Sequence, residues 1–201
     1  MAERRSDEPS IDQLRESAAG CRACELWRDA TQTVFGEGAG NPRLMLVGEQ
    51  PGDQEDLQGK PFVGPAGRLL DRALAEAGIE RGEVYVTNAV KHFRFTRRGK
   101  RRLHEKPNAG QIRACRPWLE AEIDAIKPRL IVLLGATAAQ SVMGPAFRVS
   151  RQRGEVLSSP FGVPVVATVH PSSILRAGDD ASREAALASL IADLRVAAGQ
   201  R

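Results

Sequence analysis

Three cysteines and a histidine are the side chains of this chain best suited to bind a metal. Cys21 and Cys24 have C-x-x-C spacing, which lets two thiolates bind one metal ion or cluster, whereas Cys115 lies far away in the sequence. The nearest candidate for a fourth ligand is His92, because zinc accepts three cysteines with one histidine and iron–sulfur clusters occasionally accept a histidine. A redox pair or two buried thiols are the alternatives for a bare C-x-x-C pair.

A second group of reactive side chains follows an expected buried strand over residues 44–47. The segment Gly48-Glu-Gln-Pro-Gly-Asp53 joins glycines, which allow a close backbone approach, to the carboxylates of Glu49 and Asp53 and the amide of Gln50. It is neither a dinucleotide fingerprint nor a P-loop, because the glycine spacing is wrong and no Gly-Lys-Ser/Thr follows. The alternative to a ligand site is an ordinary turn between a strand and a loop.

Two further segments could recognise a planar or anionic ligand. Phe62 lies in a glycine-flanked turn, where its ring could stack on a base or, alternatively, pack into the core. His170 begins the segment His170-Pro-Ser-Ser-Ile-Leu-Arg176, in which the imidazole could polarise a carbonyl group. Ser172, Ser173 and Arg176 could hold a phosphate, and the alternative for this segment is a helix-capping turn.

Residues 91–106 form a basic segment that includes Lys100, Arg101 and Arg102. Such a loop can contact a phosphate backbone with an affinity that falls as salt rises, although most runs of charge are solvated surface loops. Phosphate contact is favoured here because the segment leaves the same end of the expected sheet as the polar residues above. His104, held among cations, should stay neutral and keep a nucleophilic nitrogen.

The elements that would position these residues alternate between strand and helix. We expect buried strands at residues 44–47, 84–87, 130–134 and 163–169, an edge hairpin after a basic turn at 148–153, and helices at 11–19, 65–77, 108–126 and 184–196. The strand segments are apolar on both faces, which is typical of a parallel sheet covered by helices. The sequence therefore predicts an α/β class fold, a single three-layer α/β/α sandwich with a central, mostly parallel four-stranded sheet. Ligands bind at the carboxyl ends of such strands, where Glu49, Asn88 and His170 lie.

Length and composition agree with one globular domain. The chain has 201 residues, 42% of them hydrophobic and 27% charged, and we expect a flexible leader over residues 1–10 and one domain over residues 11–201. The apolar runs are far shorter than the ~20 residues of a membrane span, and the polar first residues lack a secretory signal, which predicts a cytoplasmic protein. The net charge of +4 permits an anionic partner.

In their order along the chain, these motifs resemble the uracil-DNA glycosylase superfamily, specifically its iron–sulfur family-4 type. The resemblance rests on Cys21-x-x-Cys24, Gly48-Glu-Gln-Pro-Gly52, Pro61-Phe-Val-Gly64, Val86-Thr-Asn-Ala-Val-Lys91, Cys115 and His170-Pro-Ser-Ser173. Two features depart from ordinary family-4 members: His92 stands where they have a cysteine, and the loop Lys100-Arg-Arg-Leu-His104 is additional. Both departures are similar to the UdgX subgroup, whose members excise uracil and stay covalently attached to DNA through the histidine of that loop.

The resemblance implies a role for each candidate residue. A [4Fe–4S] cluster would be held by Cys21, Cys24, His92 and Cys115. Phe62 would stack on a flipped uracil, Asn88 would read its Watson–Crick edge, and Gln50 would help orient it through its backbone or side chain. His170 would stabilise negative charge on uracil O2, while Glu49 and Asp53 are the acidic candidates near the sugar. DNA would be bound by Lys100, Arg101, Arg102, Ser172, Ser173 and Arg176.

The implied activity is excision of uracil from DNA in repair, followed by covalent attachment of His104 to C1′ of the abasic site in a single turnover. The expected partner is uracil-containing DNA, preferably single-stranded, bound by a monomer without contact to a membrane. Two alternatives remain: a hydrolytic uracil-DNA glycosylase that turns over, and a non-catalytic module that binds uracil or damaged DNA. A redox or metal-storage protein would explain neither the residues at the strand ends nor the basic segment.

Overall fold

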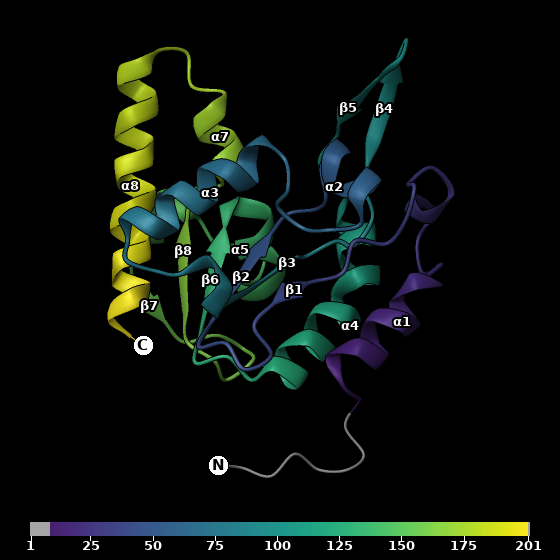
Figure 1. Ribbon diagram of the computed structural model, residues 1–201, viewed down its shortest axis with the longest axis horizontal. Coiled ribbons are helices and arrows are strands. Elements are labelled where there is room, and N and C mark those ends of the chain that lie inside the picture. Colours follow the sequence, from purple (N-terminus) through teal and green to yellow (C-terminus); the bar gives the residue numbers. More distant parts are fainter. Residues whose placement is uncertain (1–8, 201) are drawn as a thin grey trace.

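Buried apolar strands form the centre of the protein, which the computed structural model describes over residues 9–200 (Figure 1). The strands β2 (Leu44–Gly48), β3 (Val84–Asn88), β6 (Leu130–Leu134) and β8 (Val165–Thr168) pair in parallel, and all their residues are buried. Burial on both faces is why these segments are mainly apolar, with polar residues only near the ends of β3 and β8. The predicted parallel strands are confirmed.

The predicted strand number is wrong, because within the described residues the sheet has six strands in the order β1-β3-β2-β6-β8-β7. The two additional strands, β1 (Glu37–Gly38) and β7 (Val156–Leu157), are two-residue antiparallel strands at the sheet edges. Strands this short and this exposed carry no apolar periodicity that a sequence could display.

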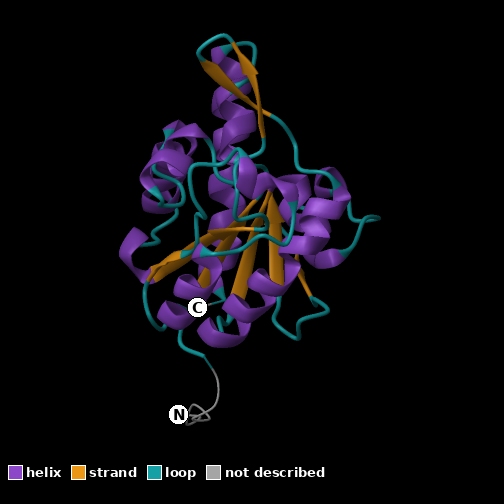
Figure 2. Cartoon of the chain, turned by 90° about the vertical axis from the view of Figure 1, so that its right-hand side faces the viewer, coloured by secondary structure: helices purple, strands orange, loops and turns teal. Residues whose placement is uncertain are grey.

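Helices cover both faces of the sheet (Figure 2). On one face lie α3 (Pro65–Glu76), α7 (Pro171–Leu175) and α8 (Asp180–Gly199), whose apolar side chains pack on Leu44 and Leu46. On the other lie α4 (Ala109–Ile126) and α5 (Gly135–Met143), which pack on Met45 and Val47, with α1 (Ile11–Ala19) outside α4. Alternate residues of β2 thus serve opposite cores, as the two-residue period of a strand requires. The three-layer prediction is confirmed.

The predicted helices agree with the structure to within a few residues. Asn108 caps α4 by accepting a hydrogen bond from the backbone N–H of Gln111, and Asp179 caps α8 in the same way, so α8 begins four residues before the predicted start. Residues 148–153, expected as a turn, contain the short helix α6 (Val149–Gln152). The other short elements are η1 (Glu25–Arg28), α2 (Asp53–Gln58) and η2 (Arg81–Glu83).

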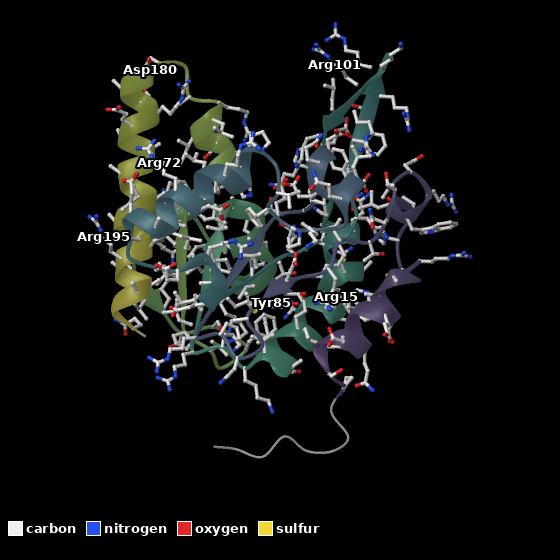
Figure 3. The ribbon with its side chains drawn as sticks, viewed as in Figure 1. Arg15, Arg72, Tyr85, Arg101, Asp180 and Arg195 are labelled. Atoms are coloured by element: carbon white, nitrogen blue, oxygen red, sulfur yellow. The ribbon has the colours of Figure 1, made fainter. Side chains whose placement is uncertain are left out.

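The basic segment is a hairpin and not the expected loop. Strands β4 (Phe95–Arg98) and β5 (Arg101–His104) pair antiparallel, and Gly99 in the connecting turn has a left-handed φ of 59°. The hairpin projects beyond the body of the protein, and Arg101 lies near its tip (Figures 1 and 3).

Two further predictions concern the flexible leader and the absence of a membrane span. Most of the predicted leader, residues 1–8, lies outside the described residues. Across residues 9–200, no helix is long and apolar enough to span a membrane.

Candidate active site

A cleft of about 740 Å³ opens where β2, β6 and β8 end beside the base of the hairpin. Its lining includes Glu49, Gln50, His104, Thr137, His170 and Arg176. A smaller pocket of about 200 Å³ shares Gln50, His104, His170 and Arg176 with this cleft and adds Phe62 and Asn88. The structure therefore brings together residues that the sequence analysis assigned to a single site from five separate segments.

Glu49 and His104 form the central polar contact of the cleft. Nε2 of His104 lies 3.2 Å from Oε1 of Glu49, and the hydroxyl of Thr137 donates a hydrogen bond to the other carboxylate oxygen. Burial raises the pKa of Glu49, but the hydrogen bonds from His104 and Thr137 outweigh it and hold that pKa below its usual value. Glu49 is thus a carboxylate, and because carboxylates only accept hydrogen bonds, Nε2 of His104 carries the proton.

Gln50 fastens the base of the hairpin to the loop that carries Glu49. Its amide nitrogen donates to the carbonyls of Arg94, at 3.1 Å, and of Glu105, at 3.0 Å, while its amide oxygen accepts from the N–H of Arg94 at 3.1 Å. Arg94 and Glu105 flank the two strands, so these bonds position His104 beside Glu49. The Gln50 side chain is committed to the hairpin, which leaves only its backbone for the predicted contact with a base.

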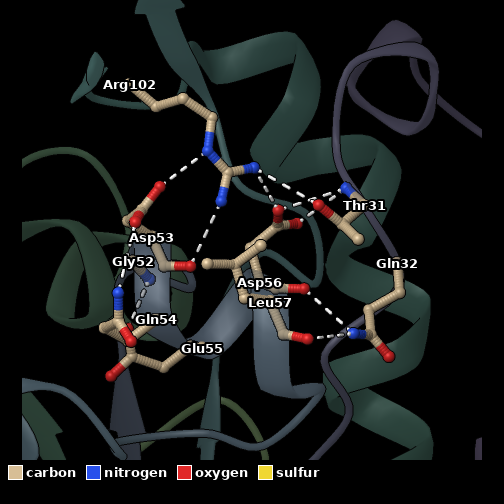
Figure 4. Close-up of polar contacts among 9 residues, drawn as sticks. All are labelled: Thr31, Gln32, Gly52, Asp53, Gln54, Glu55, Asp56, Leu57 and Arg102. Carbon is tan, nitrogen blue, oxygen red and sulfur yellow. Dashed lines mark hydrogen bonds and ion pairs between the residues drawn. The ribbon is translucent and has the colours of Figure 1, made fainter. Parts of the chain in front are cut away.

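Arg102 is a second anchor of the hairpin (Figure 4). Its guanidinium donates to Asp53 and to the fully buried Asp56, each at 2.6 Å, and its side chain is only 11% exposed. Burial lowers the pKa of Arg102, but the bonds to Asp56 and Asp53 outweigh it and raise that pKa. Arg102 is predicted to bind phosphate, but in the structure its guanidinium is paired with two carboxylates. The other two cations of the prediction, Lys100 and Arg101, are exposed.

The ion pair with Arg102 distinguishes Asp53 from Glu49, the other acidic residue predicted to lie near the sugar. Asp53 binds Arg102 on the outer side of the hairpin and lines neither the cleft nor its inner pocket, whereas Glu49 faces His104. Among these two carboxylates, only Glu49 is placed to exchange a proton with the imidazole.

The inner pocket is built around close approaches between Gly48, Phe62 and Asn88. A Cβ added to Gly48 would lie 2.4 Å from the Asn88 side-chain oxygen and 2.7 Å from the Phe62 ring, so both side chains converge on this glycine. Phe62 has a left-handed φ of 57°, a conformation that costs a non-glycine residue energy and is enriched at functional sites. Glu55 joins the two loops of this pocket by accepting hydrogen bonds from the N–H groups of Gly52 and Gly64.

His170 faces the same pocket in a neutral form. Its Nδ1 accepts a hydrogen bond of 3.1 Å from the backbone N–H of Ser172, so the ring proton is on Nε2. Burial lowers the pKa of His170 to about 4. Its ring stacks beside Phe62, with centroids 6.1 Å apart. The helix-capping alternative is also confirmed, because His170 is the N-cap of α7.

Ser172, Ser173 and Arg176 line the outer cleft next to His170. Ser173 is engaged in the cap, since its hydroxyl donates to the His170 carbonyl at 2.7 Å. Ser173 and Arg176 are exposed, so both can be reached by a phosphate from solvent.

The three cysteines converge at the amino-terminal side of α4, and all three are free thiols. Trp118 donates to Cys21 Sγ at 3.2 Å, and the backbone N–H of Lys91 donates to Cys115 Sγ at 3.1 Å. Burial raises the pKa of Cys115 to about 11, and the nearby Cys21 and Cys24 contribute in the same direction. The thiol groups are thus close enough to influence one another electrostatically.

His92, the fourth candidate ligand, has the Thr33 hydroxyl as its hydrogen-bond partner. It is buried, its Nε2 lies 3.0 Å from the Thr33 hydroxyl, and burial lowers its pKa, which keeps it neutral as a metal ligand must be. Within the described part of the chain, no three His, Cys, Asp or Glu side chains are grouped as a ready set of metal ligands. The donor chemistry of three thiols and a neutral imidazole fits an iron–sulfur cluster, and the imidazole would have to exchange Thr33 for the metal.

Thr137 and Glu55 were not singled out in the sequence. Glu55 follows Gly52 by three residues and closes a capping arrangement at α2, which is a recognisable local signal. Thr137 lies in the Ala-rich stretch after β6, where its contact with Glu49 depends on the packing of two strands and leaves no local signal.

A polar cleft at the carboxyl ends of the strands is the place where α/β sheets of this kind bind their ligands. The chain belongs to the uracil DNA glycosylase superfamily, whose family model matches residues 35–195. The type-4 uracil-DNA glycosylase of Sulfurisphaera tokodaii is 37% identical over 174 residues, 83% of this chain and 76% of that protein. That of Thermotoga maritima is 39% identical over 170 residues, 84% of this chain and 85% of that protein. These similarities place the chain in the type-4 family. A type-5 uracil-DNA glycosylase of Pyrobaculum aerophilum is 30% identical over 183 residues, 83% of this chain and 77% of that protein.

Proposed function

We propose that this protein excises uracil from DNA and that His104 then bonds covalently to C1′ of the abasic nucleotide, as in the UdgX subgroup. The observation that carries the proposal is the contact of His104 Nε2 with the Glu49 carboxylate inside the cleft. The excision step is further supported by similarity to proteins named type-4 uracil-DNA glycosylases.

Excision begins with a uracil outside the base stack, because the glycosidic bond is out of reach within a duplex. Phe62 stacks on the base, and the Asn88 side chain reads its edge. The C1′–N1 bond breaks, its electron pair leaves with uracil, and the sugar gains oxocarbenium character. The Nε2–H of neutral His170 donates to uracil O2, where the negative charge accumulates.

Attachment follows from the pairing of His104 with Glu49. The Nε2 proton first moves to Oε1 of Glu49, which frees the electron pair of the N–H bond, and that pair then forms the bond from Nε2 to C1′. The adduct then holds a neutral imidazole, and Glu49 becomes a carboxylic acid. A held nucleophile of this kind can reach an effective molarity of ~10⁵ M or more, which lets it compete with water.

The surrounding cations bind the DNA strand. Lys100 and Arg101 on the hairpin and Arg176 beside the cleft are exposed and take phosphates, with Ser172 and Ser173 as neutral partners. Single-stranded DNA is preferred, because it does not have to be unpaired before the base enters the pocket.

Cys21, Cys24, His92 and Cys115 hold a [4Fe–4S] cluster in this proposal. A cluster held there would join the segment after α1 to α4 and would serve the structure, since none of these residues lines the cleft or its inner pocket. Purified protein is expected to be brown and to contain iron and sulfide, and His92→Ala should lower the iron content. A colourless preparation with stoichiometric zinc would reject the cluster.

The test of the activity is the amount of free uracil released from uracil-containing single-stranded DNA, measured by chromatography. With DNA in excess, the proposal predicts a burst that stops near one uracil per protein molecule. Continuous release would indicate a hydrolytic enzyme that turns over, and binding without release would indicate a non-catalytic module.

A further inference from the structure

Lys91 is a fully buried cation that the proposed reaction does not use. Its side chain is 0% exposed, and its ammonium forms an ion pair with the equally buried Glu122. The same ammonium donates to the Thr87 hydroxyl at 2.6 Å and to the backbone carbonyl of Asn88 at 2.7 Å. Burial of a charged pair is costly and often adds no stability over apolar side chains of the same size, so a structural role alone does not account for it.

Glu122 is held rigidly on its other side. Its carboxylate accepts hydrogen bonds from the backbone N–H of Gly36, at 3.0 Å, and from the hydroxyls of Tyr85 and Thr87, each at 2.9 Å. Burial and the adjacent Glu122 carboxylate raise the pKa of Tyr85, which keeps that hydroxyl a donor. These bonds anchor Glu122 to the sheet, and Glu122 in turn fixes the ammonium of Lys91.

The carbonyl that Lys91 holds belongs to the residue that would read the base. Asn88 is the last residue of β3, pairs with Gly48 in the sheet and directs its side chain toward that glycine and Phe62. The backbone N–H of Lys91 also donates to Cys115 Sγ. The turn from Asn88 to Lys91 is therefore clamped at both ends.

We propose that Lys91 is a positioning residue for base recognition, which acts by fixing the Asn88 carbonyl and with it the Asn88 side chain in the inner pocket. This inference rests on the proposed function, because it assumes that Asn88 contacts uracil. Lys91 does not itself touch the base.

The test compares Lys91→Met/Glu122→Gln with Glu122→Gln. Neither protein has an unpaired buried carboxylate, and they differ in the ammonium that binds Asn88, which Glu122→Gln retains without its counter-charge. Single-turnover uracil release, with protein in excess, is measured over a range of protein concentration to separate the half-saturating concentration from the maximal rate. Iron content and thermal melting are recorded for each protein. A control pair, Arg153→Met/Asp193→Asn, removes an ion pair of 2.7 Å between the residue that follows α6 and α8, and neither residue lines the inner pocket.

The Lys91 variant is expected to show about a tenfold lower ratio of maximal rate to half-saturating concentration than Glu122→Gln, the effect of losing one hydrogen bond to a charged group. The same comparison in an Asn88→Ala background should show less than about a twofold difference, since effects that pass through one residue are not additive. The control pair should lower the melting temperature without this loss.

Equal losses in both backgrounds, or no loss in a folded Lys91 variant, would overturn the proposal. If Lys91→Met/Glu122→Gln does not fold, Lys91→Arg is tested in its place, because the planar guanidinium cannot match the three contacts of the ammonium. If the wild-type protein neither releases uracil nor binds free uracil in equilibrium dialysis, the proposed function itself is rejected. If the wild type is active but the effects of the Lys91 and Asn88 substitutions are additive, only the positioning role of Lys91 is rejected.

Discussion

Nε2 of His104 lies 3.2 Å from Oε1 of Glu49, although one residue ends the projecting hairpin and the other follows the central strand β2. The contact exists because Gln50 and Arg102 fasten the hairpin at two separate points. An acid–base pair thus forms between a rigid sheet and an appended element, and the predicted chemistry depends on both anchors.

Glu49→Gln is expected to slow formation of the DNA adduct by about 100-fold or more, because an amide keeps the hydrogen bond but cannot accept the proton from His104. The rate is measured by denaturing electrophoresis at timed intervals. Asp53→Asn provides the comparison, since Asp53 pairs with Arg102 and not with His104. A larger loss in Asp53→Asn than in Glu49→Gln would show that the proton acceptor has been misassigned.

Gln50→Ala removes three hydrogen bonds from the base of the hairpin and leaves the chemistry of Glu49 intact. Uracil should still be released, but the fraction of DNA that ends as adduct should fall about tenfold as water reaches C1′, in keeping with ~1 kcal/mol or more per lost contact. Alkaline cleavage of the free abasic DNA measures the competing product. Gln54→Ala, at an exposed amide that bonds only to Asp53, is the matched control. An unchanged product ratio in Gln50→Ala would contradict the role of Gln50.

Arg101 and Arg102 are neighbours in the sequence with opposite predicted effects on DNA binding. Arg101→Leu should lower the salt dependence of binding to thymine-containing single-stranded DNA by about one counterion, because Arg101 is exposed. Arg102→Leu should leave that slope unchanged and instead lower adduct yield, since it leaves the buried Asp56 unpaired and loosens the hairpin. Equal changes in slope for both variants would refute the distinction.

The pH dependence of excision reports on His170. Its pKa of about 4, against a usual 6.5, means that it takes up a proton only as the pH falls through about 4, where it would lose the bond from Ser172. In the His104→Ser variant, whose water-dependent release avoids titration of His104, the rate should stay flat from about pH 8 to about pH 5 and fall below that. A midpoint near 6.5 would contradict a neutral, half-buried His170.

Much of the fold could be predicted from the sequence because burial leaves a direct record in residue type. Strands such as Leu130–Leu134 are apolar at every position, and Asn108, which caps α4, is a polar residue at the predicted helix start. The edge strand Glu37–Gly38 left no such record, since it is exposed and two residues long. Its pairing with β3 depends on backbone groups, which every sequence has.

The residues of the site could be predicted from the sequence, but the hydrogen bonds that hold them in place could not. Glu49, His104 and His170 were found because reactive side chains followed strands or stood in a basic segment. The bonds from Gln50 to the carbonyls of Arg94 and Glu105 could not be foreseen, because a carbonyl carries no residue identity. Arg102 resembled its neighbours in a run of cations. Its burial follows from alternation along β5, whereas the loop expected from the sequence would have no such alternation.

The most direct test of covalent attachment through His104 is denaturing electrophoresis of wild-type protein and His104→Ser after incubation with uracil-containing single-stranded DNA. Wild-type protein should give a band of slower mobility that survives heat and denaturant, together with one free uracil per adduct. His104→Ser should give no such band while still releasing uracil through attack by water. An absent adduct with wild-type protein, or an adduct that persists with His104→Ser, would contradict the assignment of His104 as the nucleophile.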